Sequence, residues 1–243
     1  MADLENLRGP QQRRTVIAVS DVQYPEFPVE IEHHSSGLVT WRERKKQATR
    51  DAIGEAAFKL ALEVGPGNVR VDDIAAAAGV SPRTFNNYFS SREQAICTVR
   101  MRWADALGAA LTARPPGEPL DRVLCETILE VRGQGEHDKA ITRMLAATEA
   151  MRAEYLRNSL MVEFLLAEVI AGRTGCDPLA ARVVGGAFAG AIRAAGEYWL
   201  RDDGDLPFTD FLRAALERVA PAARALEDAP FPHQKSERES QAC

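Results

Sequence analysis

One short segment of this 243-residue chain carries the side chains with the clearest chemical potential. Arg83 can make paired hydrogen bonds to guanine, and Asn86 and Asn87 can do the same with adenine. The hydroxyl groups of Thr84 and Tyr88 beside them suit phosphate oxygens. These residue types at helical spacing favour a surface that reads bases and holds the backbone of a nucleic acid.

Two short helices joined by a tight turn would position this surface. We predict them at 71–78 and 82–89, and Gly79 would supply the left-handed backbone that the corner requires. Ser81 can cap the second helix, and Pro82 suits its first position. Such a helix-turn-helix brings the N-terminal half of its second helix, including Pro82, to the major groove of DNA. An apolar seam would join the two helices: Ile74, Ala75, Ala78, Val80, Phe85 and Phe89.

Basic residues precede this motif. A first helix is predicted from Trp41 to the break at Gly65, because apolar residues recur along it at helical spacing. Arg44, Lys46 and Arg50 lie near its start, where they could run along a phosphate backbone.

A basic residue also follows the motif. A fourth helix is predicted over 92–113, and the capping pattern that begins at Ser91 would start it. Arg92 lies beside the free amide groups of this helix N-terminus, so we predict that it contacts a phosphate.

The combined pattern spans about residues 41 to 100 and consists of Ile74-Ala75, Ala78-Gly79-Val80-Ser81, Thr84-Phe85, Tyr88-Phe89 and Ser91-Arg92-Glu93. In these residues the chain resembles the TetR family of bacterial transcriptional regulators. It departs from the family's pattern at Asn86, which replaces a usual tyrosine, and at Arg92, which replaces a usual lysine. Arg70 also stands where a Thr or Ser usually caps the second helix. The resemblance implies a DNA-binding domain followed by a helical domain that binds a small molecule and dimerises.

The rest of the chain also has helical periodicity. No stretch of strand length alternates between apolar and polar residues, so we predict an all-α fold. Beyond the proline-rich turn at 114–119, we expect helices at 119–132, 137–149, 151–172, 177–201 and 207–226. The predicted segments are a disordered arm (1–37), an N-terminal three-helix domain with the helix-turn-helix (38–103), a larger C-terminal helical domain for ligand binding and dimerisation (104–226), and a disordered tail (227–243).

The C-terminal residues suggest where an effector and a second subunit would bind. Methionine and aromatic side chains adapt to irregular ligands, so we predict that a mainly apolar pocket involves Met144, Met151, Tyr155 and Phe164. Small residues along 180–200 permit close helix approach, and this helix and the apolar stripe at 208–219 are predicted to pair with their copies in a homodimer. The alternatives are plain core packing for the pocket residues and packing within one chain for the two helices.

Composition narrows the classes of function. The chain has 46% hydrophobic and 27% charged residues, enough to bury a sizeable core. Its net charge of −5 hides an asymmetry. Residues 41–103 carry 11 basic and 7 acidic side chains, whereas residues 104–243 carry 16 basic and 22 acidic ones. The four cysteines lack a C-x-x-C pair and the four histidines are scattered, so we expect no metal, no cofactor and no enzyme. No apolar run could span a bilayer, which predicts a cytoplasmic protein without membrane contact.

The patterns and the resemblance together predict a sequence-specific transcriptional regulator that binds double-stranded operator DNA. The expected form is a ligand-responsive repressor that acts as a homodimer on a palindromic operator, and its effector is an unknown small molecule. Two alternatives stay open at this point: a helix-turn-helix regulator without a small-molecule effector, and an activator.

Overall fold

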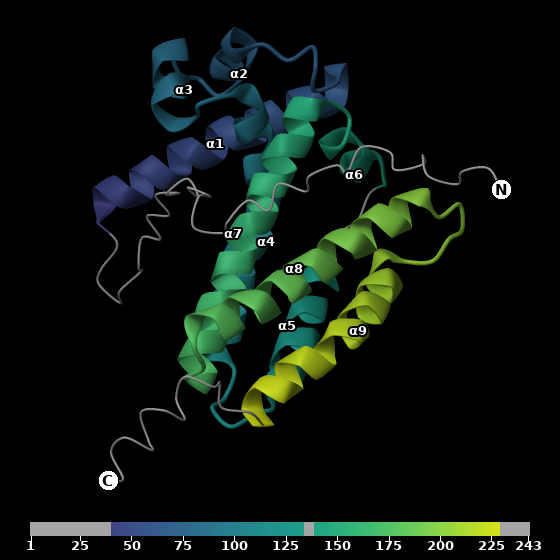
Figure 1. Cartoon of the computed structure of the whole chain (residues 1–243). Coiled ribbons are helices and arrows are strands. Elements are labelled where there is room, and N and C mark those ends of the chain that lie inside the picture. The colour runs from purple at the N-terminus through teal and green to yellow at the C-terminus, as the bar shows by residue number, and fades with distance from the viewer. Residues whose placement is uncertain (1–39, 134–138, 229–243) are drawn as a thin grey trace, which may run out of the picture. The chain divides into compact units, whose positions relative to one another are not determined.

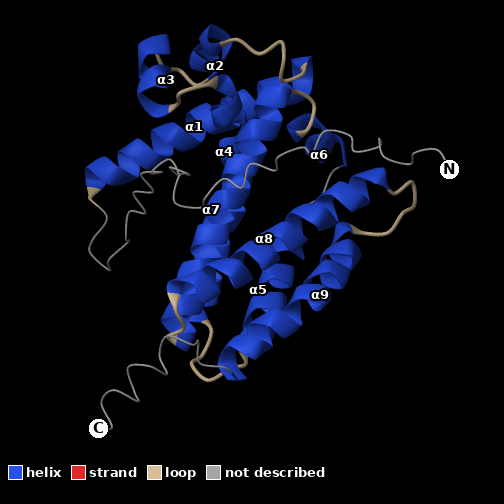
Figure 2. Cartoon of the chain, in the orientation of Figure 1, coloured by secondary structure: helices blue, strands red, loops and turns tan. Residues whose placement is uncertain are grey.

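The computed structural model describes residues 40–133 and 139–228, and all regular structure among them is helical (Figures 1 and 2). The all-α prediction is therefore confirmed for the described residues. The predicted arm at 1–37 lies outside them, as does nearly all of the predicted tail. The helices are α1 (Trp41–Val64), α2 (Val71–Ala77), α3 (Pro82–Tyr88), α4 (Arg92–Ala113), α5 (Leu120–Gly133), α6 (Lys139–Leu145), α7 (Glu149–Thr174), α8 (Pro178–Arg201) and α9 (Phe208–Asp228).

Local capping explains most of these boundaries. The Thr40 side chain accepts a hydrogen bond from the Glu43 backbone N–H at 3.3 Å, and the Glu43 carboxylate accepts one from the Thr40 N–H at 2.7 Å, so a capping box starts α1. Gly65, with a φ of 81°, ends it. The helix predicted at 137–149 is shorter in the structure, because the Thr148 hydroxyl accepts from the Met151 N–H at 3.1 Å and begins α7 at Glu149.

Two clusters of buried residues hold the helices together. The N-terminal core lies among α1 to α4 and also receives two methionines from α6 and α7: Ile53, Ala57, Ala61, Val69, Ile74, Phe85, Phe89, Ala95, Ile96, Cys97, Met144 and Met151. The C-terminal core joins the second half of α4 to α5, α7, α8 and α9, and includes Leu107, Leu111, Leu124, Ile128, Leu166, Phe188, Leu212 and Leu216. Helix α4 therefore belongs to both cores, and α6 and α7 reach the N-terminal core through their methionines.

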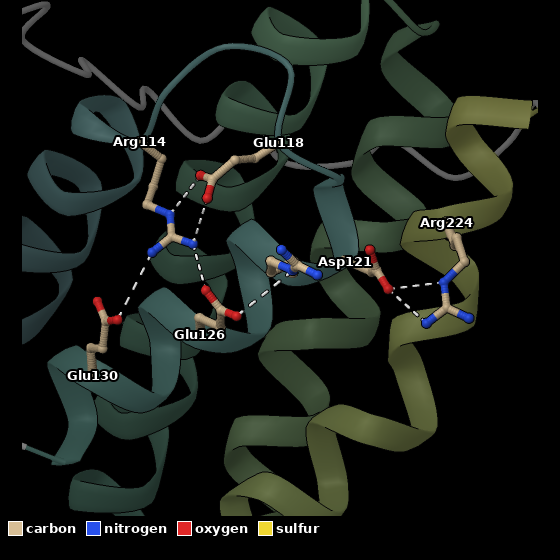
Figure 3. Close-up of polar contacts among 7 residues, drawn as sticks. Arg114, Glu118, Asp121, Glu126, Glu130 and Arg224 are labelled. Carbon is tan, nitrogen blue, oxygen red and sulfur yellow. Dashed lines mark hydrogen bonds and ion pairs between the residues drawn. The ribbon is translucent and has the colours of Figure 1, made fainter.

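Charged residues tie the far end of α4 to the bundle (Figure 3). The Arg114 guanidinium donates to the Glu118 carboxylate at 2.9 Å and to Glu126 at 2.6 Å. Arg173 of α7 donates to the backbone oxygens of Arg114 and Pro115, at 3.2 and 2.7 Å. The hydrogen bond to Glu126 is the main reason that the pKa of Arg114 is raised. These contacts hold the α4–α5 turn, so the C-terminal end of α4 is fixed against α5 and α7.

Candidate nucleic-acid interface

A helix-turn-helix is present at the predicted position. Helices α2 and α3 are joined at Gly79, whose φ of 68° is the left-handed conformation that glycine favours. The seam between them is well buried, since Ile74 is 0% exposed and Phe85 and Phe89 are 1% and 2% exposed. The Phe85 and Phe89 rings lie 5.7 Å apart. This seam fixes the orientation of α3 against α1, α2 and α4.

The outward side of α3 carries the predicted base-reading residues. Pro82, Arg83, Asn86 and Asn87 are all exposed, whereas Phe85 between them points into the core. An exposed guanidinium and two exposed amides at these spacings form a surface that can enter a major groove. Whether these residues touch bases stays a prediction.

The two predicted hydroxyl contacts on α3 lie closer to the protein. The Thr84 hydroxyl is 2.9 Å from the Ser81 hydroxyl, which also accepts from the Thr84 N–H at 3.1 Å, so Thr84 takes part in the N-cap of α3. Tyr88 is half-buried, and its backbone oxygen accepts from Arg50 Nη1 at 2.9 Å. Thr84 and Tyr88 lie beside the exposed residues of α3. Their contacts with phosphate remain predictions.

The basic residues of α1 divide into two groups. Arg44 and Lys46 are exposed on the first turns of the helix, as a phosphate contact requires. Arg50, in contrast, bonds to the end of α3 and lies 4.6 Å from the centre of the Phe89 ring. Sequence reasoning missed this bracing role, because Arg50 and α3 are brought together by the tertiary fold.

Arg92 has a structural partner that its sequence position did not indicate. Its Nη1 donates to the backbone oxygen of Val69 at 2.6 Å, and its Nε contacts the Glu93 carboxylate at 2.8 Å. Arg92 thus ties the start of α4 to the segment before α2. That link supports α2 at an N-terminus where Arg70 makes no side-chain cap, and Asp72 and Asp73 in the first turn complement the helix dipole.

A small cavity of about 60 Å³ lies in the C-terminal helices and is partly open to solvent. Its apolar wall includes Trp103, Val162, Ile192, Trp199 and Phe208. Its polar lining includes Arg132, Thr142, Tyr155, Asn158, Ser159 and Arg193. Cys97 of the N-terminal core also lines it, so the cavity reaches both cores.

The structure places the four predicted pocket residues in three different environments. Tyr155 lines the cavity. Met144 and Met151 are 8% and 0% exposed and pack into the N-terminal core instead. Phe164 lies under the Arg182 guanidinium, 3.5 Å from its ring centre. Sequence reasoning missed Arg132 and Trp199 as cavity residues, because neither belongs to a local pattern that would reveal it.

Other kinds of site are not apparent in the described residues. They contain no group of three or more His, Cys, Asp or Glu side chains placed to hold a metal ion. None of the described helices is long and apolar enough to cross a membrane. Burial raises the pKa of the Cys125 thiol to about 11, so this cysteine is a poor nucleophile at neutral pH.

Comparisons with known proteins agree with this geometry. The family model described as bacterial regulatory proteins, tetR family, matches residues 53–94, and the model described as MftR C-terminal domain matches residues 120–224. The HTH-type transcriptional regulator TcmR of Streptomyces glaucescens is 34% identical over 197 residues, which cover 75% of this chain and 86% of that protein. A crystal structure of a TetR-family transcriptional regulator from Syntrophomonas wolfei matches with a TM-score of 0.52 at 18% identity and covers 73% of this chain and 95% of that one. The chain therefore belongs to the TetR family and is a DNA-binding transcriptional regulator, not an enzyme.

Proposed function

We propose that this regulator is a ligand-responsive repressor that binds a palindromic operator as a homodimer. The observation that carries the proposal is the division of α3 into a buried side with Phe85 and an outward side with Arg83 and Asn86. Residues 38–103 would be the DNA-binding domain, and residues 104–226 would bind the effector and dimerise. Two copies of α3 would enter successive major grooves, with half-site centres about 34 to 36 Å apart.

The outward side of α8 supports dimerisation. Leu179, Val183 and Tyr198 are 62%, 63% and 64% exposed, and they lie on one side of the helix with the small residue Gly190 between them. A Cβ added at Gly190 would meet nothing within 4 Å, so the chain leaves room there for a second helix. Exposed apolar surface of this kind is typical of an interface. We propose that α8 and the adjoining side of α9 pair with their copies.

The cavity supports a response to a ligand, because its lining adjoins the N-terminal core at three points. Cys97 of α4 belongs to both. Thr142 of α6 lines the cavity two residues before the buried Met144, and Tyr155 of α7 lines it one turn after the buried Met151. A ligand that favours a different arrangement of α6 and α7 would therefore shift the N-terminal core and change the spacing of the two α3 helices.

DNA binding of the purified full chain tests the proposal. Duplexes from the promoters of its own genomic neighbourhood would be compared with scrambled duplexes at two salt concentrations, and the number of protomers per duplex would be measured. We expect sequence-specific, salt-sensitive binding with two protomers per site. Binding that is indifferent to sequence, or one protomer per site, would contradict the proposal.

Transcription in vitro then distinguishes a repressor from an activator. The purified regulator is added to a template that contains its binding site. Repression by occlusion of the promoter predicts less transcript, whereas an activator would produce more. If the regulator has no small effector, no compound that binds in the cavity should change its affinity for DNA.

A further inference from the structure

We infer that Arg50 of α1 is a positioning residue for DNA recognition, which holds the C-terminal end of α3 so that the exposed Asn86 and Asn87 meet their bases. The inference deepens the base-reading role proposed for α3 and rests on it. Arg50 would act on DNA through α3 and not through a phosphate of its own. Two observations carry the inference: the contacts of the guanidinium with the end of α3, and the short length of that helix.

The Arg50 guanidinium reaches from α1 to the end of α3, which lies beside it (Figure 1). Its Nη1 donates to the backbone oxygen of Tyr88, the last residue of α3, at 2.9 Å. The same guanidinium lies 4.6 Å from the ring centre of Phe89, which is 2% exposed. Within the described part of the chain, Arg50 pairs with no carboxylate. Its charge is therefore directed at the end of α3.

The carbonyl group that Arg50 holds needs a partner from outside its helix. The last four carbonyl groups of a helix lack an intrahelical donor, and the negative end of the helix dipole lies there. A guanidinium meets both needs, because it donates hydrogen bonds and stays positively charged. The other end of α3 has its own support, since the Ser81 hydroxyl accepts from the Thr84 N–H at 3.1 Å. Arg50 is thus the polar support of the C-terminal end, beside the buried Phe89 ring.

The length of α3 explains why this end must be held. The helix has seven residues and is about 10 Å long. A tilt of about 10° about its N-terminal end would move the C-terminal end by about 2 Å, whereas a binding group must be placed within about 0.5 Å. Asn87 is next to Tyr88, and Arg83 is near the Ser81 cap. Loss of Arg50 should therefore disturb the base pair that Asn87 reads more than the base pair that Arg83 reads.

Binding of the full chain to operator duplexes with single base-pair changes tests the inference. Arg83→Ala and Asn87→Ala first show which base pair each residue reads, as the position where discrimination is lost. Arg50→Met then removes the guanidinium and keeps an unbranched side chain. We expect Arg50→Met to lose about tenfold in operator affinity, as the loss of one hydrogen bond to a charged donor implies. Discrimination should fall more at the Asn87 base pair than at the Arg83 base pair.

The salt dependence separates a positioning residue from a phosphate contact. Arg50→Met should keep the affinity for random duplexes and the slope of affinity against salt concentration. Arg44→Ala, on the exposed start of the same helix, should weaken binding to all duplexes and reduce that slope by about one. Arg102→Met is the matched control for an arginine that joins two helices, because Arg102 of α4 pairs with Glu55 of α1 at 2.8 Å and bonds to no described residue of α3. Arg102→Met should leave base discrimination unchanged.

Hydrogen exchange of the free protein gives a readout that needs no DNA. Arg50→Met should speed exchange at the end of α3, including the Phe89 N–H that bonds to the Phe85 oxygen at 3.0 Å, and leave α2 nearly unchanged. Arg50→Lys keeps the charge and loses the planar group over Phe89, so it should show the same pattern with a loss of about threefold in operator affinity. Arg50→Lys decides the question if Arg50→Met fails to fold.

The outcomes separate this inference from the proposed function. Equal loss of discrimination at the Arg83 and Asn87 base pairs would indicate a general structural role and overturn the inference. A smaller salt slope with equal losses on operator and random duplexes would make Arg50 a phosphate contact and overturn it as well, as would unchanged exchange at the end of α3. Specific DNA binding by the wild type would stand in all three cases. A wild type without sequence preference would contradict the proposed function, and the inference would fall with it even if exchange showed that Arg50 holds α3.

Discussion

The N-terminal and C-terminal helices place their candidate functional residues differently: the first set lies outside its hydrophobic core and the second lies within its core. In the N-terminal helices, Arg83 and Asn86 lie outside a seam that packs without them. In the C-terminal helices, the cavity residues Trp199 and Phe208 are themselves part of the core. Function and stability are therefore separable in the N-terminal helices, where a reading residue can change without loss of packing, and they are coupled in the C-terminal helices.

Replacing a seam residue should give the largest effect. Phe85→Ala removes a ring that is 1% exposed and should lower the free energy of unfolding by about 3–5 kcal/mol, because a cavity would remain beside Phe89. Specific DNA binding should be lost with it. Urea unfolding of Phe85→Ala and of its exposed neighbour variant Asn86→Ala checks this. The comparison fails if the two variants are equally stable, since Asn86→Ala should change stability by less than about 0.5 kcal/mol.

In the C-terminal helices, one added methyl group tests close packing in the same way. A Cβ at Gly185 would lie 2.9 Å from the backbone atoms Ala167 N and Glu163 O of α7, which cannot move aside cheaply. Gly185→Ala should therefore cost about 1–3 kcal/mol of stability and distort the α7–α8 contact. Gly190→Ala on the same helix is the control, because its Cβ meets nothing within 4 Å.

Thermal unfolding of both glycine variants measures the difference. Gly190→Ala should be neutral or slightly stabilising in the monomer, since alanine favours helices over glycine by about 0.5–1 kcal/mol. If both variants keep the oligomeric state of the wild type, equal melting temperatures would mean that α7 and α8 are less closely packed than the structure indicates. A change in the oligomeric state of Gly190→Ala would report on the proposed dimer surface.

Changing a reading residue should leave stability intact. Arg83→Ala should weaken operator binding by about 1–3 kcal/mol and relax specificity at one base pair. Arg44→Ala, on the exposed start of α1, should weaken binding to all sequences alike and reduce the salt slope by about one. Competition among duplexes with single base-pair changes distinguishes the two effects. Equal losses on operator and random DNA in both variants would count against the assignment of Arg83.

The same division explains which features could be predicted from the sequence. The helix-turn-helix depends on residues close together in the chain, such as Gly79 and Ser81, so local rules located it. The start of α7 at Glu149, two residues before the predicted start, could also have been inferred from the sequence, because Thr148 is a capping residue. The bond from Arg50 to Tyr88 and the stacking of Arg132 on Trp103 join residues far apart in the chain, and no local signal reports such contacts.

Charge also differs between the two ends, and at Cys125 on α5 nearby charges add to the effect of burial. Burial is the main cause that raises the pKa of this thiol from 9.0 to about 11, and the nearby carboxylates of Asp121 and Glu217 raise it further. Arg224, which is bonded to Asp121 at 2.6 Å (Figure 3), acts in the opposite direction. Between pH 9.0 and about 11 the folded thiol keeps a proton that the unfolded chain has lost. The free energy of unfolding should therefore fall as pH rises through this window and be unaffected by Cys125 below it.

The smallest predicted effect is the difference between the wild type and Cys125→Ser in that window. All other groups are the same in both proteins, so the difference isolates the thiol. Urea unfolding at about pH 8 and about pH 10 should show that the wild type loses stability relative to Cys125→Ser. A relative gain would mean that Cys125 ionises more easily in the folded chain than in the unfolded one. The field at α5 would then be positive, and the contrast between a basic N-terminal region and an acidic C-terminal one would not extend to this half-buried thiol.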